Sequence, residues 1–327
     1  MFLPGKSALI ENEQILIEHI NKMTAKKNLD NISRTDAYFY FYNEHPEIQW
    51  AFLASMVSRN AGWNMCDLEG NCFPKVIGKR VRDLLYFTYE RANWLIFQDA
   101  YPQLLLYHYS TKMNKPMFHL LKKFHISSFM EREWLHFWRD GNKKRLMISL
   151  IINEQNVIQE PVIEHPVYKN KVFHTMLFAF QDYFHFSSVI FPTCKGKLYG
   201  ASVNGFRSVS KRIDLGKRLA EILFDPRFYT AVYEFASNTT HTGSRHDYEK
   251  YFKRKRPRTT PFLRCTYPII NHHIHEINDW SAKNRIKKKW RKETVSQKHP
   301  IHITEWYLHK QKQLERAAWL GNLLHSN

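Results

Sequence analysis

Along most of this 327-residue chain, apolar side chains recur every three or four positions, which is the period of an α-helix with one buried face. In residues 9–26, for example, Ile10, Ile17, Ile20 and Met23 fall on one face. The spacing predicts helices over residues 9–26, 35–43, 46–62, 79–98, 102–109, 128–139, 144–159, 168–191, 208–224, 226–236 and 306–324. Glycine is scarce and helical spacing outweighs alternation, so we expect an all-α fold, a multi-helix globular bundle.

Local signals mark several ends of the predicted helices. Ser128 and Glu131 have the spacing of a capping box, and Gly141 stands where the same helix should stop. Pro192 and the three glycines in residues 196–205 interrupt the helical pattern and mark a candidate internal boundary. Irregular structure is expected over residues 237–247, which lack periodicity, and over residues 257–271, which hold three prolines.

Positive charge rises sharply toward the end of the chain. The formal net charge is +19, with 49 Lys and Arg against 30 Asp and Glu. Basic and acidic residues number 11 and 12 in residues 1–100, 13 and 7 in residues 101–200, and 25 and 11 in residues 201–327. We therefore expect an aromatic-rich helical body over residues 1–236 and a strongly basic, less regular C-terminal region over residues 237–327, closed by an amphipathic helix. Both regions are compatible with packing as one domain.

Cysteine usage and apolar run lengths bear on the compartment. Cys66, Cys72, Cys194 and Cys265 are too sparse and irregularly spaced for a disulfide scaffold, which favours reduced thiols. The first residues lack the basic start and long apolar segment of a secretory leader. The apolar runs are also far shorter than the roughly 20 residues that span a bilayer. We expect a cytoplasmic protein with no transmembrane segment.

Three segments resemble a known family. They read HPEIQWAFLASMVSRNAGWNMCDLEG at residues 45–70, ERANWLIFQDAYPQLLLY at residues 90–107 and HTGSRHDY at residues 241–248. Together they resemble the YppC-like family, uncharacterised proteins of endospore-forming bacteria, and the similarity extends from about residue 37 to beyond residue 248. The resemblance implies a soluble bacterial protein and brings no assigned catalytic residue.

The polar segment 241–247 is the most site-like loop in the sequence. It holds two possible general bases, His241 and His246, an orienting carboxylate at Asp247 and an anion-binding Arg245. Phosphate or acyl chemistry uses such groups, although most polar loops are solvated connections. These four residues are the candidate catalytic residues of an enzyme that acts on a phosphorylated or otherwise anionic substrate.

Two further polar clusters have ordinary structural interpretations. Glu90 and Asn93 share a helix face with Trp94, which predicts either an active-site pair or, more commonly, a buried hydrogen-bonded network. A second cluster contains His272, His273, His275 and Glu276. His272 and Glu276 have ligand spacing on a helix, but HExxH and CxxC patterns are absent and the chain has 18 histidines. We therefore assign neither a metal nor a cofactor.

Two basic segments stand out in the C-terminal region. The first basic segment (residues 250–258) interleaves cations with Tyr251 and Phe252, and the second basic segment (residues 283–292) surrounds Trp290. Their cationic residues are Lys250, Lys253, Arg254, Lys255, Arg256, Arg258, Lys283, Arg285, Lys287, Lys288, Lys289, Arg291 and Lys292. Cations at this density neutralise phosphates, and aromatic rings among them can stack on exposed bases. These thirteen residues are candidate polyanion-binding residues.

Three functions remain open on the sequence alone. The leading hypothesis is a non-enzymatic or accessory protein that binds a polyanion, foremost nucleic acid, through the two basic segments. No base-reading module is recognisable, so sequence-specific recognition is not predicted. The same charge would also suit a solvated surface or an anionic membrane surface. The alternatives are the enzyme built on the 241–247 loop and a helical scaffold that binds a partner in an aromatic groove.

Overall fold

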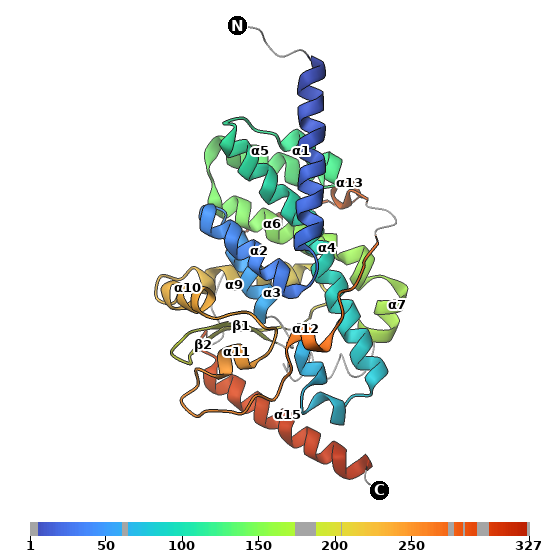
Figure 1. Cartoon of the computed structure of the whole chain (residues 1–327), viewed down its shortest axis with the longest axis vertical. Coiled ribbons are helices and arrows are strands. Elements are labelled where there is room, and N and C mark those ends of the chain that lie inside the picture. The colour runs from blue at the N-terminus through green and yellow to red at the C-terminus, as the bar shows by residue number, and fades with distance from the viewer. Residues whose placement is uncertain are drawn as a thin grey trace.

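Helices dominate the computed structural model, which describes residues 6–60, 65–173, 188–203, 205–273, 278–283, 285–292 and 301–325. Within these ranges the strands form one two-stranded sheet. The molecule is elongated: helix α1 (Lys6–Lys27) projects from one end, and helix α15 (Thr304–His325) lies at the other (Figure 1). The prediction of an all-α, multi-helix fold is confirmed.

The remaining helices fill the space between these two ends. The longer ones are α2 (Asn31–Glu44), α3 (Gln49–Asn60), α4 (Lys79–Lys112), α5 (Ser128–Asp140), α6 (Lys143–Val157), α9 (Val209–Leu223) and α10 (Tyr229–Asn238). Single-turn helices are α7 (Pro166–Tyr168), α11 (His246–Glu249), α12 (Leu263–Thr266), α13 (Trp280–Lys283) and α14 (Lys288–Arg291). Tighter or wider turns form η1 (Met65–Glu69), η2 (Phe73–Lys75), η3 (Phe118–Phe124), η4 (Gln159–Ile163) and η5 (Lys169–Phe173). Helix α2 packs on α3, α5 on α6, and α1 along α4.

Helix α4 corrects the prediction of two separate helices over residues 79–98 and 102–109. It runs for 34 residues without interruption, with Pro102 inside it. An interior proline costs a helix about 3 kcal/mol because it lacks the N–H donor. Here the flanking side chains are buried, and Tyr101 stacks on Phe97 with ring centroids 4.6 Å apart. Burial of both flanks offsets that cost, so the helix continues.

A β-hairpin replaces the end of the helix predicted over residues 168–191. The chain is helical to Phe173, residues 174–187 lie outside the described ranges, and β1 (Ser188–Pro192) then pairs antiparallel with β2 (Leu198–Ser202). Every residue of β1 is buried, so its apolar run shows no alternation and cannot be told from a helix by periodicity. Two of the three glycines that suggested a boundary, Gly196 and Gly200, belong to this hairpin. Gly200, at φ +148°, leaves only 2.0 Å between an added Cβ and the Val189 carbonyl oxygen.

The ends of helix α5 agree only partly with the expected signals. Gly141 adopts φ +65° and ends the helix as predicted. The N-cap is Ser127, whose hydroxyl accepts a hydrogen bond from the Met130 amide, whereas Ser128 is already helical and its hydroxyl contacts Ser281. The predicted capping box is therefore wrong by one residue, because adjacent serines offer the same capping chemistry.

Two apolar clusters form the interior, and α4 belongs to both. The larger cluster lies among α2, α3, α5, α6, α9, α10, β1 and the second half of α4, with Trp50 and Trp134 fully buried. The smaller cluster lies among η1, η2, η4 and the first half of α4. Aromatic residues from beyond residue 236 complete the larger cluster, among them Phe252, Trp290 and Tyr307. The irregular C-terminal part is thus packed onto the helices through its rings.

Candidate functional site

The loop of residues 241–247 is folded inward. His241 is buried, and its Nδ1 lies 3.5 Å from Asp247 Oδ2 and accepts a 3.3 Å hydrogen bond from the Gly243 amide. Asp247 also accepts hydrogen bonds of 2.8 and 2.6 Å from the Thr242 amide and hydroxyl. Burial lowers the pKa of His241. Burial alone would raise the pKa of Asp247, but the contact with His241 and the hydrogen bonds from Thr242 hold it below its usual value.

The side chains of the other two candidate catalytic residues form no hydrogen bond or ion pair with this pair, as far as the described residues show. The buried guanidinium of Arg245 has its Nε 3.3 Å from Asp67 and 3.6 Å from Glu249, and it donates to Thr259 and Gln311. His246 begins helix α11, and within the described ranges its ring makes no hydrogen bond. The structure therefore brings His241 and Asp247 together and places Arg245 in a separate ion-pair cluster.

A small cleft, partly open to solvent, lies beside Arg245. Its polar lining includes Asp67, Arg245, Tyr248, Tyr307 and Lys310, and neither His241 nor Asp247 is among the lining residues. Two carboxylates, Asp67 and Glu249, already lie against the guanidinium. The cleft thus holds balanced charge rather than a strongly positive pocket for an anionic substrate.

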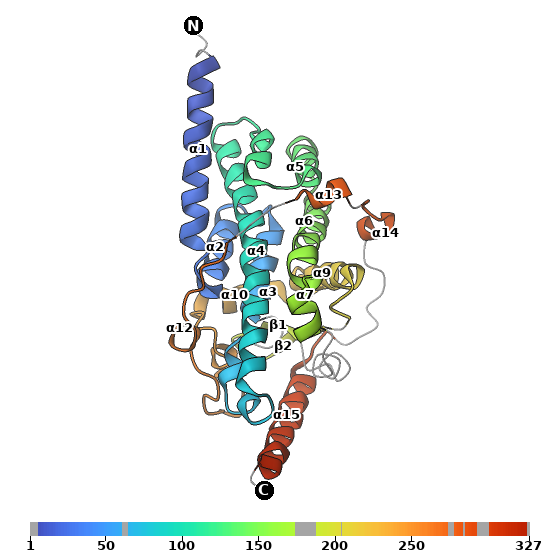
Figure 2. The ribbon, with the colours of Figure 1, turned by 90° about the vertical axis from the view of Figure 1, so that its right-hand side faces the viewer.

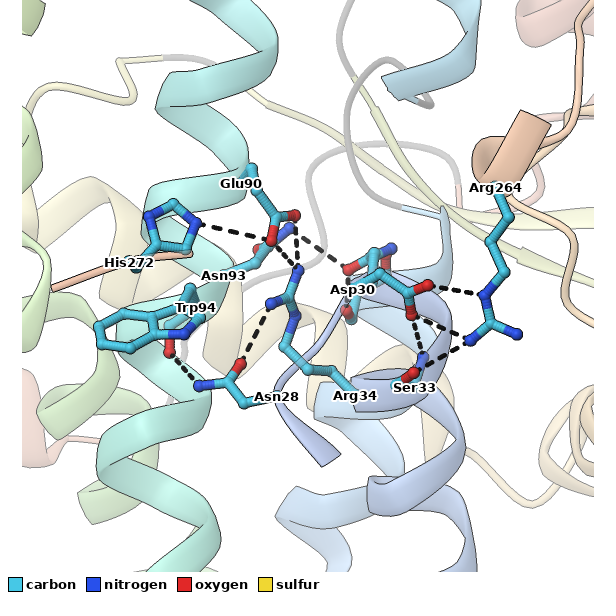
Figure 3. Close-up of polar contacts among 11 residues, drawn as sticks. Asn28, Asp30, Ser33, Arg34, Glu90, Asn93, Trp94, Arg264 and His272 are labelled. Carbon is cyan, nitrogen blue, oxygen red and sulfur yellow. Dashed lines mark hydrogen bonds and ion pairs between the residues drawn. The ribbon is translucent and has the colours of Figure 1, made fainter. Parts of the chain in front are cut away.

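Glu90 lies in a buried network between α2 and α4 (Figure 3). Both of its carboxylate oxygens accept hydrogen bonds from Arg34 Nη2, at 2.6 and 2.5 Å, and both side chains are almost fully buried. Asn28 links Arg34 to the Trp94 carbonyl oxygen, with hydrogen bonds of 3.1 Å on each side. The geometry is that of a buried hydrogen-bonded network, the commoner of the two interpretations expected for Glu90 and Asn93.

The histidine cluster at residues 272–276 contributes one ring to this network. His272 lies with Nε2 3.8 Å from Glu90 Oε1 and its ring beside Trp94 (Figure 3). Arg91 donates to the His273 carbonyl oxygen at 2.9 Å. His275 and Glu276 lie outside the described residues. Since Arg34 occupies both oxygens of Glu90, His272 packs against an ion pair that is already complete.

The two basic segments expose most of their cations, bury Phe252 and Trp290, and half-bury Tyr251. Phe252 packs on Tyr307, Tyr251 bonds Thr239, and Trp290 donates from Nε1 to Ser210 at 2.9 Å. All thirteen cationic residues are exposed except Arg256, which is half-buried. Within the described ranges only Arg256 and Arg291 form ion pairs, with Glu315 and Glu133 respectively. The rings anchor each segment to the core, and most of these cations have no acidic partner among the described residues.

The two segments lie on different sides of the molecule. Figure 2 places α14, which belongs to the second basic segment, opposite α12, which follows soon after the first. Helix α14 contacts α6 and α9. Arg291 and Arg145 both bind the buried carboxylate of Glu133, which joins the second segment to α5 and α6. Each basic segment is therefore a surface of its own.

Two half-buried carboxylates lie outside the candidate sites named from the sequence. Asp99 on α4 accepts hydrogen bonds from Gln103 and Asn153, and Glu154 on α6 accepts a 3.0 Å hydrogen bond from Trp50 Nε1. Burial raises the pKa of each to about 7. Asp99 was visible only as one polar residue among apolar ones, and its partner Asn153 is 54 residues away. Nothing local in the sequence links the two.

Fold and interior define the class as a predominantly α-helical protein with aromatic-rich cores and an internal charged network. The chain belongs to the family described as "Protein of unknown function (DUF2515)", matched over residues 26–308. It is 49% identical over 300 residues to the uncharacterised protein YppC of Bacillus subtilis (strain 168), covering 91% of this chain and 93% of that protein. The expected YppC-like membership is confirmed.

One further comparison and one property of the helices concern the fold. No solved structure matches this chain. In the described part of the chain, no helix is long and apolar enough to cross a membrane.

Proposed function

We propose that this protein binds a polyanion of the nucleic-acid class, with the second basic segment as the main contact and the first as a separate one. The observation that carries the proposal is the set of exposed cations without acidic partners. Lys287, Lys288 and Lys289 are exposed on and beside α14, and none has an ion pair within the described ranges. Lysines in this setting neutralise phosphates and release condensed counterions.

The way α14 is held supports contact with a nucleic-acid backbone. Trp290 is buried and bonded to Ser210, so its ring is unavailable for stacking on a base. The same anchor fixes the neighbouring lysines on an ordered turn instead of a free tail. Phosphate contacts made by such lysines position a protein without reading sequence. We therefore infer salt-sensitive, sequence-independent binding.

The enzyme alternative has less support. His241 and Asp247 are buried and lie 3.5 Å apart, and Asp247 accepts two hydrogen bonds from Thr242, which favours a structural role in holding the loop. Arg245 is occupied by Asp67 and Glu249. These contacts leave the four candidate catalytic residues without a shared opening toward a substrate, and we propose no reaction for them.

The test is binding of the full chain to fluorescent single- and double-stranded nucleic acid across a salt series, with heparin and anionic vesicles as competing surfaces. The variant Lys288→Glu/Lys289→Glu should weaken binding and lower the magnitude of the salt slope by about 2, close to one unit per lost phosphate contact. The matched control is Lys122→Glu/Lys123→Glu, an exposed lysine pair on η3 with the same change in net charge.

The control separates a binding surface from a general charge effect. The proposal predicts that the control retains the wild-type salt slope. Equal losses in both variants would show attraction to net charge alone and would overturn the assignment to α14. Binding to anionic vesicles without binding to nucleic acid would overturn the proposed partner class.

A further inference from the structure

Two histidines from different helices meet at the surface where α2 ends beside α4. His45 follows the last residue of α2, and His108 lies one turn before the end of α4. His45 Nε2 and His108 Nδ1 are 2.9 Å apart, with the ring planes nearly perpendicular. Their side chains are 12% and 17% exposed, so the two nitrogens face each other close to solvent.

The surrounding groups fix the orientation of His45. Its Nδ1 lies 3.2 Å from Glu47 Oε1, and that oxygen also accepts a 2.8 Å hydrogen bond from the Tyr107 hydroxyl. A carboxylate at Nδ1 holds the proton there, which leaves the Nε2 lone pair directed at His108. The ring is further held between Phe41 and Tyr107, with centroids 4.9 and 5.3 Å away. This is the arrangement by which an outer carboxylate prepares a histidine to ligate a metal.

A third ligand atom completes the cluster. Glu44 Oε2 lies 3.5 Å from His108 Nδ1, and the ligand atoms of Glu44, His45 and His108 all fall within 4.8 Å of one another. Ligand atoms around a tetrahedral Zn²⁺, at metal distances of about 2.0–2.2 Å, are about 3.3–3.5 Å apart. The observed separations need only small side-chain shifts to surround an ion. Burial and the like charge of Lys112 lower the pKa of His108.

We propose that Glu44, His45 and His108 form a binding site for a divalent transition-metal ion of the Zn²⁺ class. Two imidazoles and one carboxylate suit zinc and its neighbours, whereas Mg²⁺ and Ca²⁺ require oxygen ligands. Three protein ligands leave one position for water, as in zinc sites that remain open to exchange. Glu47 is a positioning residue that acts through His45.

The test uses the full chain, stripped of metal with a chelator and titrated with Zn²⁺ by calorimetry. Because the chain has 18 histidines, the readout is the difference between variants. We expect wild type to bind one Zn²⁺ that His108→Gln and Glu44→Gln lose or bind at least tenfold more weakly. The matched control is His119→Gln, an exposed histidine 3.0 Å from Glu13 but without a second imidazole. It should titrate like wild type.

Two further measurements keep the result unambiguous. Co²⁺ in place of Zn²⁺ should give the intense visible absorption of a four-coordinate site in wild type and in His119→Gln, and not in His108→Gln. Glu47→Gln should weaken Zn²⁺ binding about 10–100-fold, as loss of an outer carboxylate does. Equal stoichiometry and affinity in wild type and His108→Gln, with both folded by circular dichroism, would overturn the site. Absence of Zn²⁺ binding to wild type would do the same.

Discussion

Cations in two regions of the molecule are held in opposite ways. The Arg34 side chain is 1% exposed, and its guanidinium donates to both carboxylate oxygens of Glu90. In contrast, Lys288 and Lys289 are exposed and have no acidic partner in the described ranges. A buried charge that loses its partner has no water to replace it, while an exposed lysine is already hydrated. Position therefore separates the cations that stabilise the fold from those that are exposed to solvent.

The largest expected effect is at the buried pair. Glu90→Gln keeps the shape of the side chain but leaves Arg34 charged and without a counter-charge, which should lower the free energy of unfolding by about 3–5 kcal/mol. Urea unfolding followed by tryptophan fluorescence measures it. The control is Asp83→Asn, which breaks an exposed pair with Lys79 and should cost less than about 0.5 kcal/mol. Similar losses in the two variants would erase the contrast between the two regions.

A second prediction concerns two half-buried acids, and varying the pH tests it. Asp99 and Glu154 have folded-state pKa values of about 7, against about 3.9 and 4.3 in an unfolded chain. The folded state therefore binds more protons between pH 4 and 7, and stability falls as pH rises through that window. The loss should be on the order of 2 kcal/mol per group.

Asn or Gln at these two positions would mimic the protonated acid. Asp99→Asn and Glu154→Gln should each flatten the dependence of the urea midpoint on pH between 4.5 and 8. Asp83→Asn, which breaks the exposed ion pair with Lys79, again serves as the control. It should leave the shape of the plot of urea midpoint against pH unchanged. If Asp99→Asn and Glu154→Gln both retain the wild-type dependence of the urea midpoint on pH, neither acid is protonated in the folded state near neutral pH.

The smallest expected effect is at the surface lysines. Lys288→Glu/Lys289→Glu should change the free energy of unfolding by no more than about 0.5 kcal/mol, since both side chains are exposed and neither has an ion pair with a described residue. Thermal and urea unfolding beside wild type measure the change. A loss of 2 kcal/mol or more would show that these lysines stabilise the fold, and any drop in polyanion binding would then need a different explanation.

The apolar spacing predicted helices correctly where one helix face is buried and the other is exposed to solvent. The spacing found α2, α5, α6, α9 and α15 within a few residues of their observed ends. It failed at β1, where burial on both faces removes the alternation that would distinguish a strand. It also divided α4 at Pro102, because a local rule about proline takes no account of the packing on either side.

The sites were less predictable because their parts lie far apart in the chain. Glu90 and Asn93 could be marked as inward polar residues, but Arg34 is 56 residues from Glu90. His45 and His108 are 63 residues apart, and neither sits in a ligand-spacing motif. The basic segments were visible from composition. Trp290 faces the core and its lysine neighbours face solvent because α14 packs against α6 and α9. The sequence pattern alone does not predict that packing.

Helix α4 has a consequence for how the molecule opens. At about 1.5 Å per residue its 34 residues extend about 50 Å, through the smaller cluster and then the larger one. Because one continuous helix contributes to both apolar clusters, their fluctuations are coupled. Neither cluster can unfold without releasing part of the helix that packs against the other. In hydrogen-exchange terms, amides on the two sides of Pro102 then belong to one cooperative opening unit, and protection lost in one half is lost in both.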